Sequence, residues 1–252
     1  DSGLSAWLMG VALAMSGCDP MTTRCDSTGC VPDDATFPDD ELEKASPQCR
    51  RFVAWVMARE IKVVVFDMDL TMGAGHCGTG LELADLDSYV DAASPDFVEA
   101  ATILSRIPGV RLAVATNSDP AEYDLPGQSC ETHILGPDLA QHLIRRRCPE
   151  ALPHFGIMVG FDPELHEDVP RLPGKSVHMR QIAAHYGVPF RNMVLIDDSA
   201  SRLENTDGWH GVLVRNTSIG FRFEDCFVDD SLPPDLRAAH RHSPEPFGRG
   251  EG

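Results

Sequence analysis

Two aspartates spaced two residues apart carry the strongest chemical signal in the sequence. Asp67 and Asp69 follow residues 61–66, an almost continuously apolar segment rich in valine. Such a segment is typical of a strand that is buried on both faces of a parallel sheet. Ligands bind at the carboxyl ends of such strands, and paired carboxylates there suit a hard divalent cation such as Mg²⁺. Because aspartate can also act as a nucleophile, the pair indicates a metal site or a covalent catalyst, with an acidic turn as the alternative.

Two later segments add a hydroxyl and an ammonium group to this pattern. Residues 111–115 predict a second buried strand, which is followed by Thr116 and Asn117. Lys175 stands at the start of a predicted helix, where a cation opposes the helix macrodipole and a functional role is favoured for that reason. The alternatives are an ordinary strand end for Thr116 and a solvated first-turn lysine for Lys175.

A further buried strand is predicted over residues 193–196, and it is followed by Asp197 and Asp198. Between residues 61 and 216 the chain thus carries an aspartate pair, a threonine, a lysine and a second aspartate pair. This order resembles the four motifs of the haloacid dehalogenase-like (HAD) hydrolase superfamily. Each motif alone is weak, but the four together, three of them at predicted strand ends, form a specific pattern.

The resemblance implies a Mg²⁺-dependent phosphatase that works through an aspartyl-phosphate intermediate. Asp67 is expected to attack phosphorus and to bind the metal. Asp69 is expected to act as general acid and then as general base, and to bind the metal through its backbone carbonyl. Asp197 and Asp198 complete the expected metal shell. Asp197 is the first choice, because Asp198 also suits a helix cap.

The other residues of the motifs are expected to neutralise charge or to contact the substrate. Lys175 offsets the charges of the nucleophile and the phosphate. Thr116, Asn117 and Thr71 form the expected substrate-binding set, in which Thr116 donates to the phosphoryl group and Thr71 orders the loop after the nucleophile. Because Asp69 is present, the resemblance favours a phosphatase over the dehalogenase branch, which lacks this residue.

Strands alternate with helices along the chain, which predicts an α/β fold. The expected architecture is a Rossmann-like three-layer sandwich with a central, mostly parallel five-stranded sheet. The predicted strands span residues 61–66, 111–116, 155–159, 193–196 and 211–214, and the predicted helices follow Ser46 and span 94–107, 137–148, 175–186 and 201–206.

The segments between the motifs leave room for a small flap and no cap domain. Residues 73–93 are Gly-rich and then acidic, and residues 117–154 hold one loop and one helix. Within the superfamily this resembles the minimal-cap class, similar to the magnesium-dependent phosphatase, whose open site admits phosphotyrosine-like, sugar-phosphate and phosphoprotein substrates. A phosphomutase and a non-catalytic binding protein on the same fold are the alternatives.

Length and composition predict one sizeable domain, over residues 46–229. Residues 1–45 are expected to form a disordered or processed extension and residues 230–252 a loose tail. A formal net charge of −18 argues against nucleic acid as a partner. The apolar run within residues 4–18 resembles a signal peptide but lacks a preceding basic residue, so a cytoplasmic location is expected, with export or membrane tethering as the alternative.

The eight cysteines lack the spacing of a zinc site and are expected to be free thiols in a reducing compartment. The expected partner is a phosphorylated small molecule or a phosphoprotein, with no membrane involved. Nothing in the sequence indicates an oligomeric state.

Overall fold

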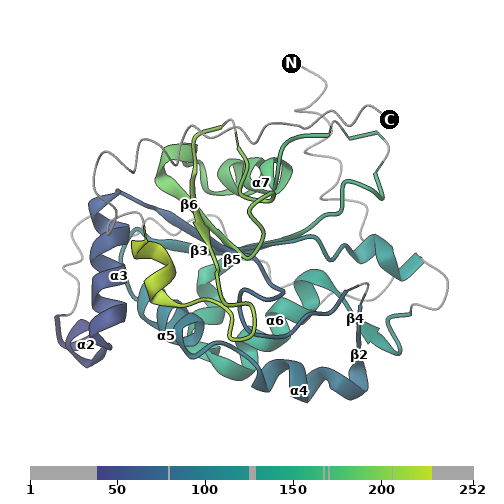
Figure 1. Ribbon diagram of the computed structural model, residues 1–252, viewed down its shortest axis with the longest axis horizontal. Coiled ribbons are helices and arrows are strands. Elements are labelled where there is room, and N and C mark those ends of the chain that lie inside the picture. The colour runs from purple at the N-terminus through teal and green to yellow at the C-terminus, as the bar shows by residue number, and fades with distance from the viewer. Residues whose placement is uncertain are drawn as a thin grey trace, which may run out of the picture.

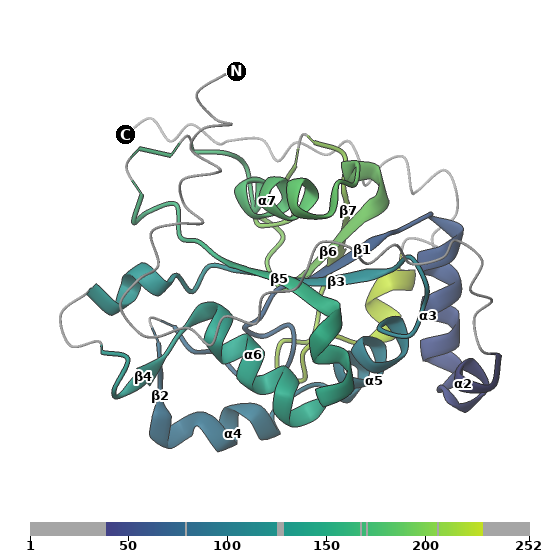
Figure 2. The same cartoon turned by 180° about the vertical axis from the view of Figure 1, so that it is seen from behind.

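The computed structural model describes residues 39–228 apart from 79, 125–128, 167, 170 and 206. Its centre is a five-stranded sheet in the order β5-β3-β1-β6-β7, in which every pairing is parallel (Figures 1 and 2). The predicted α/β layout with its five-stranded sheet is therefore confirmed. The strands are β1 Val63–Phe66, β3 Arg111–Thr116, β5 Phe155–Gly160, β6 Met193–Asp197 and β7 His210–Leu213.

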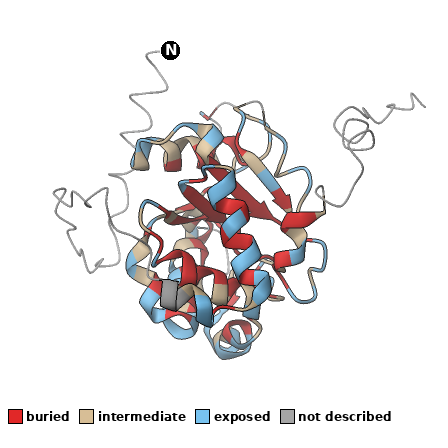
Figure 3. Ribbon diagram, turned by 90° about the vertical axis from the view of Figure 1, so that its left-hand side faces the viewer, coloured by how far each residue is buried: buried red, intermediate tan, exposed pale blue. Residues whose placement is uncertain are grey.

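The sheet lies between two layers of helices. One face is covered by α3 (Pro47–Ala58), α5 (Pro95–Leu104) and α6 (Gly136–Arg147), and the other by α7 (Ser176–Tyr186) (Figures 1 and 2). Figure 3 shows the buried residues concentrated in the sheet and on the inward sides of the helices.

Strand β1 occupies the middle of the sheet and has no exposed side. All four of its residues are buried, with Val64 and Phe66 in one apolar core and Val63 and Val65 in the other. Alternation along the strand assigns successive side chains to opposite faces. The continuous apolar run in the sequence follows from these two cores, because each face demands its own set of large side chains.

Two helix starts follow their predicted chemistry. The Ser46 and Ser94 hydroxyls accept hydrogen bonds from Cys49 N and Phe97 N, and a proline follows each serine in the first turn. Helix α7 ends at Gly187, which adopts the left-handed conformation (φ 65°) that glycine tolerates best.

The two segments expected to form loops near the site pair with each other. Strand β2 (Leu81–Glu82) and strand β4 (His133–Ile134) form a small antiparallel sheet, and β2 leads into α4 (Leu86–Asp91). We refer to residues 73–93 as the flap. It holds one short α-helix and one two-residue strand, which agrees with the expected small flap. Short 3₁₀ helices complete the described secondary structure at Leu83–Asp85, Pro120–Asp124, Pro149–His154, Phe190–Asn192 and Phe223–Phe227.

One sequence prediction differs from the structure. A helix is predicted over residues 201–206, but the chain makes only a turn over residues 200–203, and the Arg202 carbonyl accepts from Lys175 N just before α7. Helix α2 (Asp39–Lys44) precedes the predicted domain start at Ser46, and Leu42 packs against the larger core. The domain bounds stay a prediction.

The expected extension, the apolar run within residues 4–18 and the C-terminal tail lie in residues 1–38 and 229–252, outside the described residues. Among the helices that the structure describes, none has the length and apolar character needed to cross a bilayer. Five cysteines within the described residues are free thiols: Cys49, Cys77, Cys130, Cys148 and Cys226.

Candidate active site

Asp67 and Asp197 meet around the buried ammonium group of Lys175. Asp67 directly follows β1, where its N–H donates to Ile196 O (2.9 Å), and Asp197 ends the neighbouring strand β6. Lys175 Nζ donates to Asp67 Oδ1, and it lies 2.8 Å from Asp197 Oδ2. The three residues are at most 6% exposed. Adjacent parallel strands therefore bring together two carboxylates that are 130 residues apart in the sequence.

The backbone before α7 fixes Lys175 in this position. Lys175 Nζ also donates to Ala115 O (2.7 Å) on β3, so the ammonium group joins three strands. Its backbone N–H donates to Arg202 O (3.1 Å). Gly174 has a φ of 53°, and a Cβ there would collide with the carbonyl oxygens of Arg202 and Glu204. Only glycine fits this approach, so Gly174 sets where the lysine enters the site.

Asp198 joins the two buried aspartates to form a cluster that could hold a metal ion. One carboxylate oxygen from each of Asp67, Asp197 and Asp198 lies within 4.8 Å of the others. Asp197 Oδ1 accepts from Ser199 N (2.8 Å), which orients its carboxylate. Carboxylate oxygens are hard donors of the kind that Mg²⁺ prefers. The structure thus brings both members of the second aspartate pair together with Asp67, and their role as metal ligands stays a prediction.

Burial and charge act in opposite directions at this cluster. Burial raises the pKa of the Asp67 carboxyl, and the nearby charge of Lys175 opposes the rise. Burial lowers the pKa of Lys175, but Asp67 and Asp197 outweigh that effect and raise it overall. Burial and the charge of Asp197 raise the pKa of Asp198. Lys175 pairs with two of the three carboxylates, and a divalent cation would neutralise the remaining charge.

The Asp69 carboxylate lies outside this cluster and is held by the flap. Its Oδ1 accepts from Tyr89 OH (2.7 Å), while its Oδ2 accepts from Cys77 N and Cys77 Sγ (both 3.1 Å) and lies 3.1 Å from His76 Nδ1. Burial, reinforced by the charge of Asp69, raises the pKa of both Cys77 and Tyr89, so both remain protonated donors. The resemblance gives Asp69 only a backbone contact to the metal, and that contact remains a prediction.

The loop after Asp67 turns sharply and buries Thr71. Leu70 adopts a φ of 55°, uncommon for a residue with a side chain, and its N–H donates to Gly75 O (2.8 Å). Thr71 is fully buried, and its carbonyl accepts from Phe221 N (2.8 Å). It does not line the pocket that Asp67, Asp69 and Lys175 line. Its place fits the expected role in ordering the loop and not a contact with substrate.

The remaining two members of the expected substrate-binding set line the pocket beside Arg202. Thr116 Oγ1 accepts from Ser118 N (3.1 Å). The Asn117 amide oxygen, in the orientation that satisfies both groups, accepts from Arg202 Nη2 (2.9 Å) and Nη1 (3.1 Å). A guanidinium group is well suited to an anionic substrate. Sequence reasoning missed Arg202, because it lay in the segment assigned to a helix.

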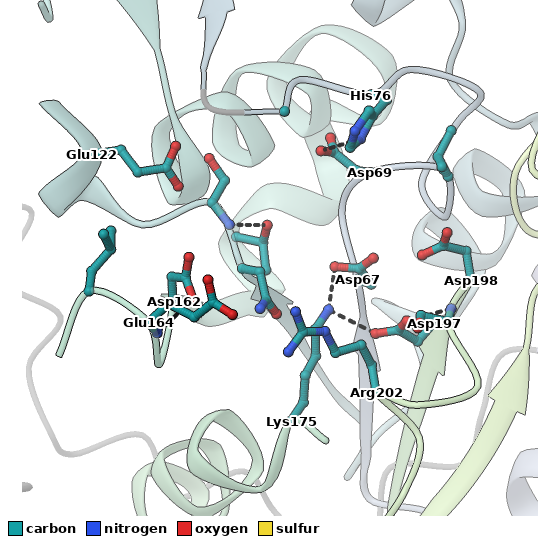
Figure 4. Close-up of a pocket in the computed structure, with 17 residues that line it drawn as sticks. Asp67, Asp69, His76, Glu122, Asp162, Glu164, Lys175, Asp197, Asp198 and Arg202 are labelled. Carbon is teal, nitrogen blue, oxygen red and sulfur yellow. Dashed lines mark hydrogen bonds and ion pairs between the residues drawn. The ribbon is translucent and has the colours of Figure 1, made fainter. Parts of the chain in front are cut away.

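These residues surround one pocket of about 500 Å³ at the carboxyl ends of β1, β3 and β6 (Figure 4). Its lining includes further side chains that sequence reasoning missed: His76 from the flap, Glu122 from the segment after β3, and Asp162 and Glu164 from the segment after β5. No sequence motif predicts these residues, because each lies in a loop whose position depends on the folded chain.

Comparison with known proteins gives few matches. No protein-family model matches the chain, and no curated protein matches it significantly. The N-terminal part of protein BF1531 from Bacteroides fragilis, described as containing a phosphatase domain complexed with Mg, is 17% identical, with a TM-score of 0.39. That match covers 66% of this chain and 40% of the other.

A probable YrbI family phosphatase from Pseudomonas syringae pv. phaseolica is 14% identical, with a TM-score of 0.32, and the match covers 76% of this chain and 99% of the other. This chain thus spans less than half the length of the first neighbour. Likeness at this level supports no inference about function, which has to come from the geometry of the site.

Proposed function

We propose that this protein is a Mg²⁺-dependent phosphomonoester hydrolase that acts through an aspartyl-phosphate on Asp67, on the pattern of the minimal-cap HAD phosphatases. The observation that carries the proposal is the meeting of Asp67, Asp197 and Asp198 around the buried Lys175 at one edge of a parallel sheet. Burying several carboxylates together lowers the stability of the fold. Such clusters are typical of functional sites, so this arrangement supports a catalytic metal centre.

The residues present fit a magnesium ion. Asp67, Asp197 and Asp198 offer carboxylate oxygens from two adjacent strand ends, and their combined charge exceeds that of Lys175 by two units. When bound, Mg²⁺ supplies charge neutralisation between the nucleophile and the phosphate oxygens.

In the first step an Asp67 carboxylate oxygen attacks phosphorus and forms an acyl-phosphate bond. The bond from phosphorus to the leaving oxygen breaks, and Asp69, protonated at this stage, donates its proton to that oxygen. Lys175 stabilises the ionised form of Asp67 before attack and the phosphoryl charge during it. We expect Arg202 and Thr116, which line the same pocket, to contact the phosphoryl oxygens.

In the second step Asp69, now ionised, takes a proton from water. The resulting nucleophile attacks phosphorus, the bond to Asp67 breaks, and inorganic phosphate leaves. The hydrogen bonds from Tyr89 and Cys77 hold the Asp69 carboxylate in one orientation. One carboxylate thus serves both half-reactions.

A panel of phosphomonoesters tests the proposal directly. Purified protein is assayed for phosphate release from p-nitrophenyl phosphate, phosphotyrosine and sugar phosphates, with Mg²⁺ and with a chelator. We expect hydrolysis that needs Mg²⁺ and returns when the metal is restored. Hydrolysis that continues unchanged in chelator would contradict the metal assignment, and no release from any ester would contradict the phosphatase assignment.

A further inference from the structure

The pocket carries more negative charge than the proposed reaction needs. Lys175 and Arg202 are the only permanently charged cations among the described residues that line it. The lining carboxylates are Asp67, Asp69, Glu122, Asp162, Glu164, Asp197 and Asp198. Such a surface repels a phosphate dianion unless the repulsion is offset elsewhere in the substrate.

The excess charge lies on one side of the pocket. Lys175, Arg202 and a bound Mg²⁺ can offset the aspartates at the ends of β1 and β6. Glu122, Asp162 and Glu164 follow β3 and β5, and we refer to them as the acidic wall. Figure 4 shows the acidic wall apart from Asp67, Asp197 and Asp198, across the pocket.

Glu122 supplies the observation that points to a ligand. Its side chain is 6% exposed and lines the pocket. Its Oε1 accepts from Asp119 N (2.8 Å), but its buried Oε2 has no hydrogen-bond partner among the described residues. A buried carboxylate oxygen without a partner is costly, so this atom is poised to receive a donor from outside the chain.

The acidic wall is held together by the buried Asp119. Asp119 Oδ2 accepts from Asp162 N (2.9 Å) and lies 2.7 Å from His166 Nε2, and Asp119 Oδ1 accepts from Ala121 N (2.9 Å). Asp162 Oδ1 in turn accepts from Glu164 N (2.9 Å). These contacts join the segments after β3 and β5, so the wall is part of the folded framework.

The charges of this region also act on Glu122 itself. Burial raises the pKa of the Glu122 carboxyl, and the neighbouring charges of Asp119, Asp162 and Asp69 add to the effect. Within the part of the chain that the structure describes, no lysine, arginine or histidine side chain forms an ion pair with any of the three wall carboxylates.

We propose that the acidic wall selects phosphomonoesters whose leaving group carries a cationic ammonium or guanidinium group. This inference rests on the proposed phosphatase function and specifies its substrate class. The phosphate occupies the end of the pocket at Asp67, and the cation of the leaving group reaches Glu122 Oε2. A second metal ion fits less well, because the described residues offer only one cluster of three convergent ligands, and that cluster is at Asp67.

Two matched esters test this selection. O-Phosphotyramine and 4-ethylphenyl phosphate share the same aryl ester and differ by one ammonium group. We expect kcat/KM with Mg²⁺ to favour O-phosphotyramine by about five- to tenfold, which corresponds to one partly buried ion pair, and we expect the preference to shrink as salt is added.

Glu122→Gln removes the charge while the amide oxygen can still accept from Asp119 N. In this variant kcat/KM should fall for the cationic ester and rise for the neutral one, because the dianion is repelled less, so the preference collapses. Glu164→Gln, at an exposed position that tolerates change, should reduce the preference in part. Glu60→Gln removes the same charge next to the opposite end of β1 and should leave both rates and their ratio unchanged.

A binding measurement separates this inference from the proposed reaction. Tyramine and 4-ethylphenol, the two leaving alcohols, are titrated into the protein and followed by NMR. Tyramine should bind more tightly, and Glu122→Gln should abolish the difference. Equal kcat/KM values for the two esters, or a preference that survives Glu122→Gln, would contradict the proposed selection by the acidic wall. Neither result would contradict the proposed phosphatase function. If neither ester is hydrolysed the phosphatase fails, and the tyramine titration alone then supports or overturns the wall.

Discussion

The two carboxylates of the first motif lie two residues apart, yet they belong to different regions of the pocket. Asp67 is held by the sheet, through Lys175 and the end of β6. Asp69 is held by the flap, through Tyr89, Cys77 and His76. In the proposed mechanism, the sheet region would provide fixed charge for a metal and a nucleophile, and the flap region would provide hydrogen-bond donors to the general acid and base. Mutations in the two regions should therefore produce different kinetic signatures.

The largest loss is expected from Asp67→Asn in the sheet region. An amide is a poor nucleophile and a poor metal ligand, so turnover should fall by at least about a thousandfold. The measurement is steady-state hydrolysis of p-nitrophenyl phosphate with saturating Mg²⁺. Near-native turnover in a clean preparation would contradict the covalent mechanism.

Although Asp67→Asn should lower activity, it should raise the stability of the folded protein in the absence of metal. Because burial raises the pKa of Asp67, the folded protein holds that proton more tightly than the unfolded chain does, and the associated stability is lost as pH rises above the ordinary carboxyl range. Asn carries no charge to bury. Without metal, the melting temperature of Asp67→Asn should therefore exceed that of the wild type by an amount that grows as pH rises toward neutrality. A difference in melting temperature that does not change with pH would contradict this account.

Lys175→Met should remove both activity and stability. It leaves Asp67 and Asp197 buried without their shared cation, which costs about 3–5 kcal/mol, and turnover should fall by about a hundredfold. Added Mg²⁺ should raise the melting temperature of this variant more than that of the wild type, since three uncompensated carboxylates attract the ion more strongly. An equal or smaller Mg²⁺ effect would place the metal elsewhere.

In the flap region, Asp69→Asn should give a loss that depends on the leaving group. The loss should be smallest with p-nitrophenyl phosphate, whose leaving group needs little protonation, and largest with alkyl esters. A long-lived phosphoenzyme should accumulate, because the second half-reaction lacks its base. Equal damage across leaving groups would indicate that Asp69 has a structural or metal-binding role.

The smallest effect is expected from Tyr89→Phe, which removes the hydroxyl that donates to Asp69 Oδ1. One hydrogen bond to a charged group is worth about 1.5–3 kcal/mol, so kcat for alkyl esters should fall by about ten- to a hundredfold and that for p-nitrophenyl phosphate by less. Tyr186→Phe is the matched control, because Tyr186 OH donates to Leu112 O (2.7 Å), away from the pocket. It should lower stability without changing the dependence on the leaving group.

The same two regions differ in how well the sequence predicts them. The sheet region follows from local signals. Strands buried on both faces give continuous apolar runs, and the carboxyl ends of parallel strands meet at one edge, so Asp67, Thr116 and Asp197 were expected together. Lys175 was identified through the motif order, and its burial between two aspartates gives a physical reason for it.

The flap region could not be predicted in the same way. Strands β2 and β4 have two residues each, which is too few for any periodic pattern. His76, Cys77 and Tyr89 reach Asp69 only because the flap folds back over the first motif. The Thr71 hydroxyl is of a type that could contact a substrate, but the residue is buried, and its carbonyl accepts a hydrogen bond from Phe221 N. The pairing of β2 with β4, the contacts to Asp69 and the burial of Thr71 all depend on segments that meet only in the folded chain.

The contact between Thr71 and Phe221 bears on how the protein is synthesised. The loop after Asp67 is made early, but the Thr71 carbonyl accepts from Phe221 N, 150 positions later, and Ser94 Oγ donates to Phe221 O (2.6 Å) as well. A chain still on the ribosome with α6 complete would have β1, β3 and the flap but neither β6 nor this closing segment. Such a nascent chain lacks two of the three aspartates of the proposed metal cluster, and β1 has no β6 beside it, so an edge of the central strand stays unpaired until residues 193–197 are made.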